Sequence, residues 1–217
     1  MALYFVERTY AIFTSQDLLH WELLQKFDLP GDDECPDLYP LTADDGRTLW
    51  VYSGAHDMYF VGDFDENGLY QPIQSVGQLS YNSQSYAAQT YYYEPGKPVI
   101  RFAWNRSDIP GAPFNGSMCT PTEMTLKKHG DRYYLSALPI KSTENLVVKS
   151  DKLDDFTLAH CTHELGSKTC RISFTVKEGD LTCSLYGLEM KLDKNGLTCG
   201  ESILPLSLIH ISEPTRQ

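Results

Sequence analysis

The chain has 217 residues, of which 41% are hydrophobic, and carries a formal net charge of -11 at pH 7. This length is sufficient for one large all-β domain, or for one domain and part of a second. The negative charge disfavours nucleic acid and anionic membranes as partners, because both repel an acidic protein. No apolar run approaches the roughly 20 residues that a membrane-spanning helix needs, so we expect no membrane partner.

Short strands separated by turns are expected along the first third of the chain. Apolar, aromatic and β-branched residues predict strands at 10–14, 49–53 and 58–64. A turn is expected at 54–57, and the sequence DENG at 65–68 is a strong hairpin signal. No helical period continues for more than about two turns.

The segment ECPD, residues 34–37, lies between an acidic turn and an apolar stretch. Pro36 is expected to hold Cys35 in extended geometry, which would present Glu34 from a stiff loop. The two aspartates before Glu34 disfavour a further negative charge, so we expect the protonated side chain to be favoured there. A carboxylic acid that stays protonated near neutral pH can protonate a leaving oxygen. A solvated acidic loop at the start of a strand is the simpler interpretation of the same four residues.

Further short strands are expected in the rest of the chain, on both sides of a change in composition. Residues 142–158 are rich in Lys, Asp, Glu and Ser, which makes this region the candidate domain boundary. Many short strands at regular spacing are typical of a propeller, a barrel or a sandwich, so the predicted fold class is all-β. The predicted strands are 86–93, 99–104, 124–126, 133–138, 170–177, 182–188 and 189–192.

The cysteines show no metal-site spacing. His160-Cys161-Thr162-His163 resembles part of a zinc site but has no second ligand pair, so we expect neither a metal nor a cofactor. Free thiols are the simplest interpretation, with disulfides among the last four cysteines as the alternative. The six cysteines are at positions 35, 119, 161, 170, 183 and 199.

The end of the chain differs from the rest. Residues 206–217, LSLIHISEPTRQ, resemble the translated sequence of a transposase adapter used in sequencing libraries. A segment of that kind carries no information about the fold. In this interpretation the last domain is cut short.

Five sequence blocks, in order and at suitable spacing, resemble glycoside hydrolase family 32, the family of invertases, levanases and inulinases. The resemblance extends from about residue 10 to about residue 146 and is nearest to the bacterial levanase-like branch. The blocks are TSQDLLHW at 14–21, ECPDLY at 34–39, LWV with YFVGDFD at 49–65, YAAQT with RFAW at 86–104, and PFN to EMTL at 113–126.

The fold implied by this resemblance is a five-bladed β-propeller followed by a β-sandwich. The expected domains are about the last half of the propeller at 1–145, the start of a truncated sandwich at 146–205, and the adapter-like tail at 206–217. The site would be a funnel at the propeller axis.

The activity implied by the resemblance is retaining hydrolysis of β-fructosides, with levan, inulin or sucrose as the carbohydrate partner. Glu34 would be the general acid/base, paired with an aspartate nucleophile roughly 5–5.5 Å away. Cys35 would adjust the environment of Glu34, and Trp104 and Tyr86 would contact the sugar.

Two blocks of the family are missing from the chain. The family nucleophile lies in a W-M-N-D-P-N-G block and a second aspartate in an R-D-P block, and the chain contains neither. We therefore expect an internal fragment that lacks the N-terminal blades and the nucleophile, and that has no fructosidase activity by itself. The alternative is a non-catalytic propeller that binds sugar through Trp104, Tyr86 and the acidic loops.

Overall fold

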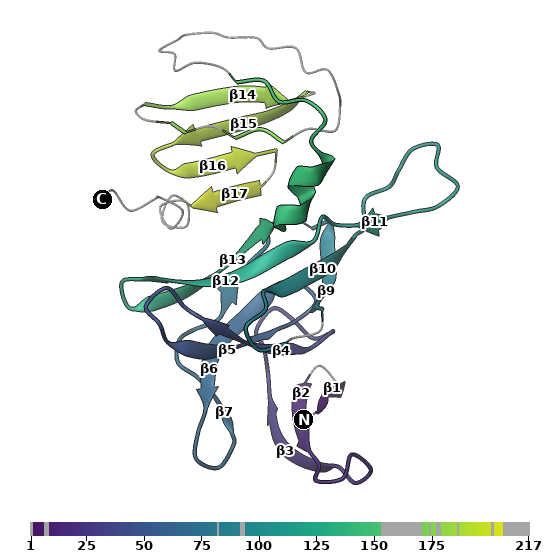
Figure 1. Ribbon diagram of the computed structural model, residues 1–217, viewed down its shortest axis with the longest axis vertical. Coiled ribbons are helices and arrows are strands. Elements are labelled where there is room, and N and C mark those ends of the chain that lie inside the picture. The colour runs from purple at the N-terminus through teal and green to yellow at the C-terminus, as the bar shows by residue number, and fades with distance from the viewer. Residues whose placement is uncertain are drawn as a thin grey trace. The chain divides into compact units, whose positions relative to one another are not determined.

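A computed structural model describes residues 2–6, 9–81, 83–91, 94–152, 171–173, 175–176, 179–185, 187–200 and 202–205. The chain separates into two compact units, Met1–Lys141 and Ser142–Gln217. Antiparallel sheets make up almost all the regular structure of the described residues (Figure 1). The all-β prediction is therefore confirmed.

The first unit contains three antiparallel sheets. The first has the order β1-β2-β3, and its middle strand is buried at Tyr10, Ala11 and Ile12. The loop between β2 and β3 and the start of β3 carry four exposed apolar side chains, Leu18, Leu19, Trp21 and Leu23. The strands are β1 (Ala2–Val6), β2 (Thr9–Thr14) and β3 (Glu22–Phe27).

The second and third sheets have five strands each. The second has the order β4-β5-β6-β7, with β8 also paired to β6, and the third has the order β11-β10-β12-β13, with β9 also paired to β10. The second sheet consists of β4 (Asp37–Thr42), β5 (Thr48–Ser53), β6 (Met58–Phe64), β7 (Tyr70–Pro72) and β8 (Gly77–Gln78). The third consists of β9 (Ser85–Thr90), β10 (Val99–Asn105), β11 (Ser117–Met118), β12 (Thr122–His129) and β13 (Arg132–Pro139).

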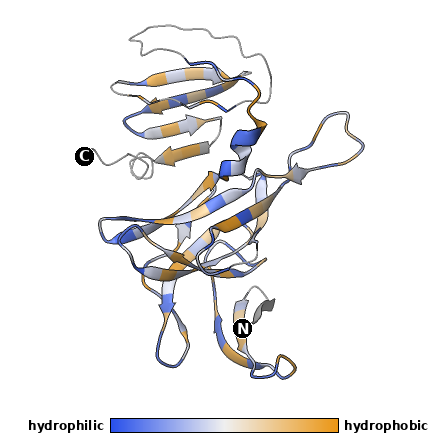
Figure 2. Cartoon of the chain, in the orientation of Figure 1, coloured by the Kyte–Doolittle hydropathy of each residue, from blue (hydrophilic) through white to orange (hydrophobic). Residues whose placement is uncertain are grey.

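Successive side chains of a strand point to opposite faces of its sheet. In the second sheet both faces are buried, each against a different hydrophobic core. On β5, Val51 belongs to a core shared with β10, β12 and β13, whereas Tyr52 belongs to an aromatic core shared with β2. Figure 2 shows the hydrophobic residues distributed along these strands. A parallel bridge between Ala43 and Leu126 also joins the second and third sheets. Three small antiparallel sheets that follow one another along the chain and pack face to face fit the partial β-propeller expected from the sequence.

The second unit contains a four-stranded antiparallel meander in the order β14-β15-β16-β17. Its first two strands match the predictions at 182–188 and 189–192, but β16 and β17 have no counterpart among the predicted strands. The strand predicted at 170–177 is wrong for residues 171–173 and 175–176, which form no regular structure. The strands are β14 (Leu181–Leu185), β15 (Leu188–Asp193), β16 (Gly196–Cys199) and β17 (Ser202–Pro205).

The domain limits at 145/146 and 205/206, and the sandwich assignment, stay predictions. The segment His160-Cys161-Thr162-His163 and residues 206–217 lie outside the described residues. Of the six cysteines, the described ones are free thiols, at 35, 119, 183 and 199. The described part of the chain has one short 3-10 helix, Lys141–Leu146, and no helix there is long and apolar enough to cross a membrane.

Candidate functional site

Glu34 lies in the loop between β3 and β4, and its backbone is fixed by two other parts of the first unit. Its carbonyl oxygen accepts hydrogen bonds from the Tyr10 hydroxyl at 2.8 Å and from the Ala55 amide at 2.9 Å. The side chain itself is exposed. The loop therefore holds the backbone of Glu34 in place and leaves its carboxylate accessible.

Cys35 does not have the extended backbone expected from the proline that follows it. Its φ is 48°, in the left-handed region that non-glycine residues rarely adopt, so that prediction is wrong. The local effect of Pro36 is outweighed by tertiary hydrogen bonds on both sides, because the Gln89 side-chain amide also donates to the Cys35 carbonyl at 3.0 Å. Burial raises the pKa of the half-buried thiol, with a smaller contribution from the negative charge of Glu34.

Tyr86 on β9 provides a direct side-chain partner for Glu34. Its hydroxyl donates a hydrogen bond to the Glu34 Oε2 atom. This hydrogen bond is the main reason that the pKa of Tyr86 is raised to about 12, and desolvation adds to it. The phenol therefore remains a protonated donor across the neutral range.

The Tyr86 ring contacts three side chains, one from the turn at 54–57, one from the end of β10 and one just after it. Its centroid lies 4.9 Å from that of the His56 ring and 6.3 Å from that of Trp104, both edge-on. The Arg106 guanidinium lies over the ring at 4.2 Å. Trp104 is 44% exposed, so its ring is available to a ligand.

The carboxylates of Asp37 and Asp32 connect the segments around Glu34 through hydrogen bonds. Asp37 links β4 to β9, and Asp32 links the loop before β4 to the turn after β5. Asp37 Oδ2 accepts the Thr90 amide at 2.6 Å, which ties β4 to β9, and burial raises the pKa of Asp37. The buried Asp32 accepts the His56 amide at 2.7 Å and lies 3.1 Å from His56 Nδ1. Both carboxylates are thus part of the framework of the site.

Asp32, Asp33 and His56 each place one possible ligand atom within 4.8 Å of the others. The oxygens of Asp32 already accept hydrogen bonds from the His56 and Asp33 amides. Because those bonds hold the loop and the turn together, we assign no metal to this group.

Asp57, the last residue of the turn at 54–57, forms a buried ion pair with Arg101 on β10. The two side chains are 3% and 11% exposed. Ser85 lies between them, with its hydroxyl 3.4 Å from Asp57 Oδ2 and 3.3 Å from an Arg101 nitrogen. Burial raises the pKa of Asp57, and the positive charge of Arg101 opposes this rise.

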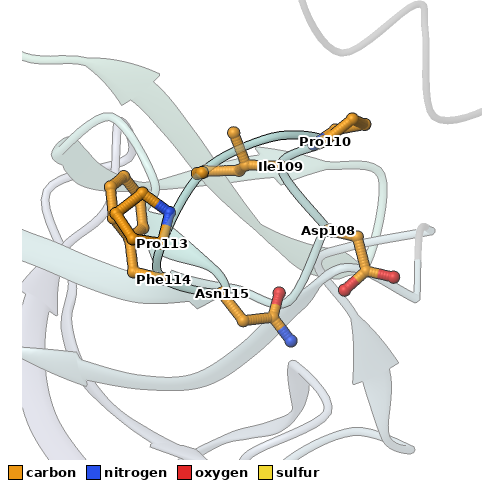
Figure 3. A pocket seen from close by; sticks show the side chains of 7 residues that line it. Asp108, Ile109, Pro110, Pro113, Phe114 and Asn115 are labelled. Atoms are coloured by element: carbon orange, nitrogen blue, oxygen red, sulfur yellow. The ribbon is translucent and has the colours of Figure 1, made fainter.

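A pocket of about 490 Å³ lies in the loop between β10 and β11, apart from the residues above. Figure 3 shows Ile109, Pro113 and Phe114 as its apolar lining, with Asp108 and Asn115 on the same loop. Neither Glu34 nor any side chain that touches Tyr86 lines it. The pocket is therefore separate from the contacts between Glu34 and Tyr86.

Gly54 is a packing requirement of the site. A Cβ atom at this position would lie 2.4 Å from Asp32 Cγ and 2.5 Å from the Tyr10 hydroxyl. We expect Gly54→Ala to lower the free energy of unfolding by about 1–3 kcal/mol, because the buried neighbours must move. Urea denaturation of the parent and of Gly54→Ala measures the change. An unchanged free energy of unfolding in Gly54→Ala would contradict the steric explanation.

Of the predicted site residues, Glu34 and Tyr86 are in direct contact, Trp104 packs on Tyr86, and Cys35 follows Glu34 in the loop. His56 and Arg106 are the residues of the site that sequence reasoning missed. In the sequence, His56 looks like an ordinary residue of the turn predicted at 54–57. Its contact with Tyr86 joins residues that are distant in the sequence, so no local pattern indicates it. Arg106 likewise follows a strand and carries no motif of its own.

The stacked antiparallel sheets define the class as a β-propeller, and in it an exposed carboxylate accepts a hydrogen bond from a phenol that packs against further aromatic rings. Residues 6–137 match the model of the glycosyl hydrolases family 32 N-terminal domain. The chain belongs to this family, and the resemblance inferred from its sequence is confirmed.

Relatives and solved structures agree with this assignment. The chain is 28% identical over 162 residues to a fructan beta-fructosidase of Streptococcus mutans, covering 62% of this chain and 11% of the relative. It is 26% identical over 184 residues to a levanbiose-producing levanase of Bacillus subtilis, covering 74% and 34%. The exo-inulinase of Aspergillus awamori superposes with a TM-score of 0.53 at 25% identity, covering 61% of this chain and 31% of that chain.

Fructan 1-exohydrolase IIa of Cichorium intybus has the same fold, with a TM-score of 0.52 at 17% identity over 64% of this chain and 32% of that chain. The chain thus spans between 11% and 34% of the length of these four proteins.

Proposed function

We propose that the protein hydrolyses β-fructosidic bonds of a fructan or of a sucrose-type sugar, with Glu34 as general acid/base. The observation that carries the proposal is the hydrogen bond from the Tyr86 hydroxyl to the exposed Glu34 carboxylate within a family 32 domain. The names of the relatives, a fructan beta-fructosidase and a levanase, support the substrate class.

The proposed chemistry uses Glu34 twice. In the first step its carboxyl group protonates the leaving oxygen, and in the second its carboxylate removes a proton from the attacking water. The phenol of Tyr86 fixes the orientation of the carboxyl group by occupying Oε2. The exposed face of Trp104 and the ring of Tyr86 offer apolar surfaces for a sugar ring.

A retaining mechanism also needs an attacking carboxylate roughly 5–5.5 Å from the acid. Three carboxylates near Glu34 are already engaged: Asp32 with His56, Asp37 with Thr90, and Asp57 with Arg101. We assign the nucleophile to none of them. For this reason we expect the 217-residue chain to show no turnover when assayed alone.

The test is the release of fructose by the product of the complete open reading frame that carries this sequence. Purified protein is incubated with levan, inulin and sucrose, and the anomer first formed is followed by NMR. We expect fructose release with retention at the anomeric carbon. An inverted product would contradict the mechanism, and no release from any of the three sugars would contradict the function.

The second candidate function is sugar binding without catalysis. Asp32, Asp37 and Asp57 already have hydrogen-bond or ion-pair partners. This favours sugar binding without catalysis, because a binding surface needs no second, free carboxylate. Calorimetric binding of fructan by a product that releases no fructose would distinguish this function from hydrolysis.

A further inference from the structure

The turn at 54–57 connects the loop of Glu34 to the strand of Tyr86. The Ala55 amide donates to the Glu34 carbonyl at 2.9 Å, and the Ala55 carbonyl accepts the Ala87 amide at 2.9 Å. Glu34 and Tyr86 come from segments 52 residues apart, and the direct hydrogen bonds from Gln89 to Cys35 and from Thr90 to Asp37 also join these segments. The turn is therefore one of the connections that set their relative position.

His56 extends this connection to the side chains. Its ring meets the edge of the Tyr86 ring at a centroid distance of 4.9 Å and an interplanar angle of 72°. On its other side, Nδ1 lies 3.1 Å from Asp32 Oδ1, and the backbone amide donates to Asp32 Oδ2 at 2.7 Å. The Asp32 side chain is fully buried, whereas that of His56 is 47% exposed. Asp32 thus fixes both the backbone and the ring of His56.

The backbone on both sides of the contact is strained. Cys35, next to Glu34, has a φ of 48°, and Ala87, next to Tyr86, has a φ of 51°. Non-glycine residues keep such angles only where surrounding contacts determine them, and they gather at functional sites. The contacts to the turn at 54–57 are among those that hold both segments in place.

We propose that Asp32 and His56 are positioning residues that keep the Tyr86 phenol on the Glu34 carboxylate. The His56 ring meets the edge of the Tyr86 ring and limits rotation of that side chain, while the Arg106 guanidinium covers its face. Arg106 is held by a hydrogen bond from its guanidinium to the Ser83 carbonyl at 2.7 Å, whereas His56 is held by the buried Asp32 carboxylate. Neither Asp32 nor His56 needs to touch the sugar. The catalytic consequence of this proposal rests on the proposed function of Glu34.

The first test measures the Tyr86–Glu34 contact directly and does not require activity. The 217-residue chain is labelled with 13Cζ-tyrosine, and the Tyr86 resonance is the one missing from Tyr86→Phe. A phenol that donates to a carboxylate has a downfield 13Cζ shift. We expect His56→Ala to lose this downfield shift, in the direction that Glu34→Ala produces, and Asp32→Asn to lose part of it.

The chain offers a matched control in a second histidine–aspartate pair. His20 Nδ1 lies 2.6 Å from Asp17 Oδ2 in the exposed hairpin between β2 and β3. His20→Ala removes an equivalent pair and should leave the Tyr86 resonance unchanged. An unchanged Tyr86 shift in both His56→Ala and Asp32→Asn would overturn the proposal.

The second test uses the complete enzyme. We expect His56→Ala to lower kcat on sucrose by roughly 10- to 100-fold with little change in KM, because the acid is misplaced while the sugar surface remains. An activated fructosyl fluoride needs no proton on its leaving group and should lose much less. Equal losses on both substrates would indicate general damage and contradict a positioning role. A changed Tyr86 resonance with full activity on sucrose would show that catalysis does not need the Tyr86 contact and would overturn the positioning role, whereas the role of Glu34 itself is tested by Glu34→Gln.

Discussion

Replacement of Glu34 by glutamine in the complete enzyme is expected to lower kcat on sucrose by roughly 10²- to 10⁴-fold, the usual contribution of a general acid or base. Glutamine keeps an oxygen that can accept the Tyr86 hydroxyl but has no proton to transfer at neutral pH. The geometry around Tyr86 should therefore survive while the proton transfer is lost. Steady-state kinetics on sucrose and levan measure the effect.

The loss should depend on the leaving group. An activated fructosyl fluoride does not need protonation in the first step, so Glu34→Gln should slow its first step far less than that of sucrose. Glu66→Gln is the matched control, because Glu66 is also exposed and lies in the hairpin turn at 65–68, outside the loop of Glu34 and strand β9. Parent-like rates for Glu34→Gln on sucrose would remove Glu34 from the mechanism.

Removal of Arg101 is expected to give the largest loss of stability in the first unit. Arg101→Met leaves the Asp57 carboxylate, whose side chain is 3% exposed, without its positive partner. Breaking a buried ion pair on one side typically costs about 3–5 kcal/mol, because the remaining charge is left in a poorly solvated place. Urea denaturation followed by tryptophan fluorescence measures the change.

The pH dependence of this loss tests its electrostatic origin. Burial already raises the pKa of Asp57, and without Arg101 to oppose it the pKa in the folded state rises further. The unfolded chain keeps the ordinary value of 3.8. Stability is therefore retained below that value and lost as pH rises through the folded pKa. The difference between Arg101→Met and the parent should be smaller at about pH 4 than at about pH 7.

Two companion variants make the interpretation specific. The double variant Arg101→Met with Asp57→Asn removes both charges and should recover much of the stability lost at neutral pH. Lys128→Met breaks the exposed pair with Asp45 and should change stability much less. A loss in Arg101→Met that is independent of pH, and that the double variant does not reduce, would contradict the electrostatic explanation.

Local patterns predicted much of the fold, because strands and hairpins depend on nearby residues. The hairpin at 65–68 forms as expected: the Gly68 amide bonds the Asp65 carbonyl at 2.9 Å, and Asp65 Oδ1 accepts the Asn67 amide at 2.9 Å. Strand β5 alternates between its two buried faces as the pattern at 49–53 implies. These features needed no information from distant parts of the chain.

The parts that could not be predicted depend on distant contacts. The backbone of Cys35 follows tertiary contacts such as the hydrogen bond from Gln89, 54 residues away, rather than the preference set by Pro36. His56 gains its contacts with Asp32, 24 residues earlier, and with Tyr86 only after the sheets have stacked. Glu34 could be identified because its motif is a continuous stretch of sequence. The residues around it could not, because they come from distant parts of the chain.

The double burial of the second sheet has a consequence for how β5 keeps its alignment. In a sheet with one solvent-exposed face, a one-residue shift in strand register moves the apolar side chains into solvent. The cost of exposing them prevents the shift. Both faces of β5 are apolar, so the same shift would move Tyr52 into the space that holds Val51, with no hydrophobic residue exposed. Differences in side-chain volume, rather than differences in polarity, therefore fix the alignment of this strand. Substitutions that change side-chain volume on β5 should therefore lower the free energy of unfolding more than polar substitutions on the edge strands of the sheet.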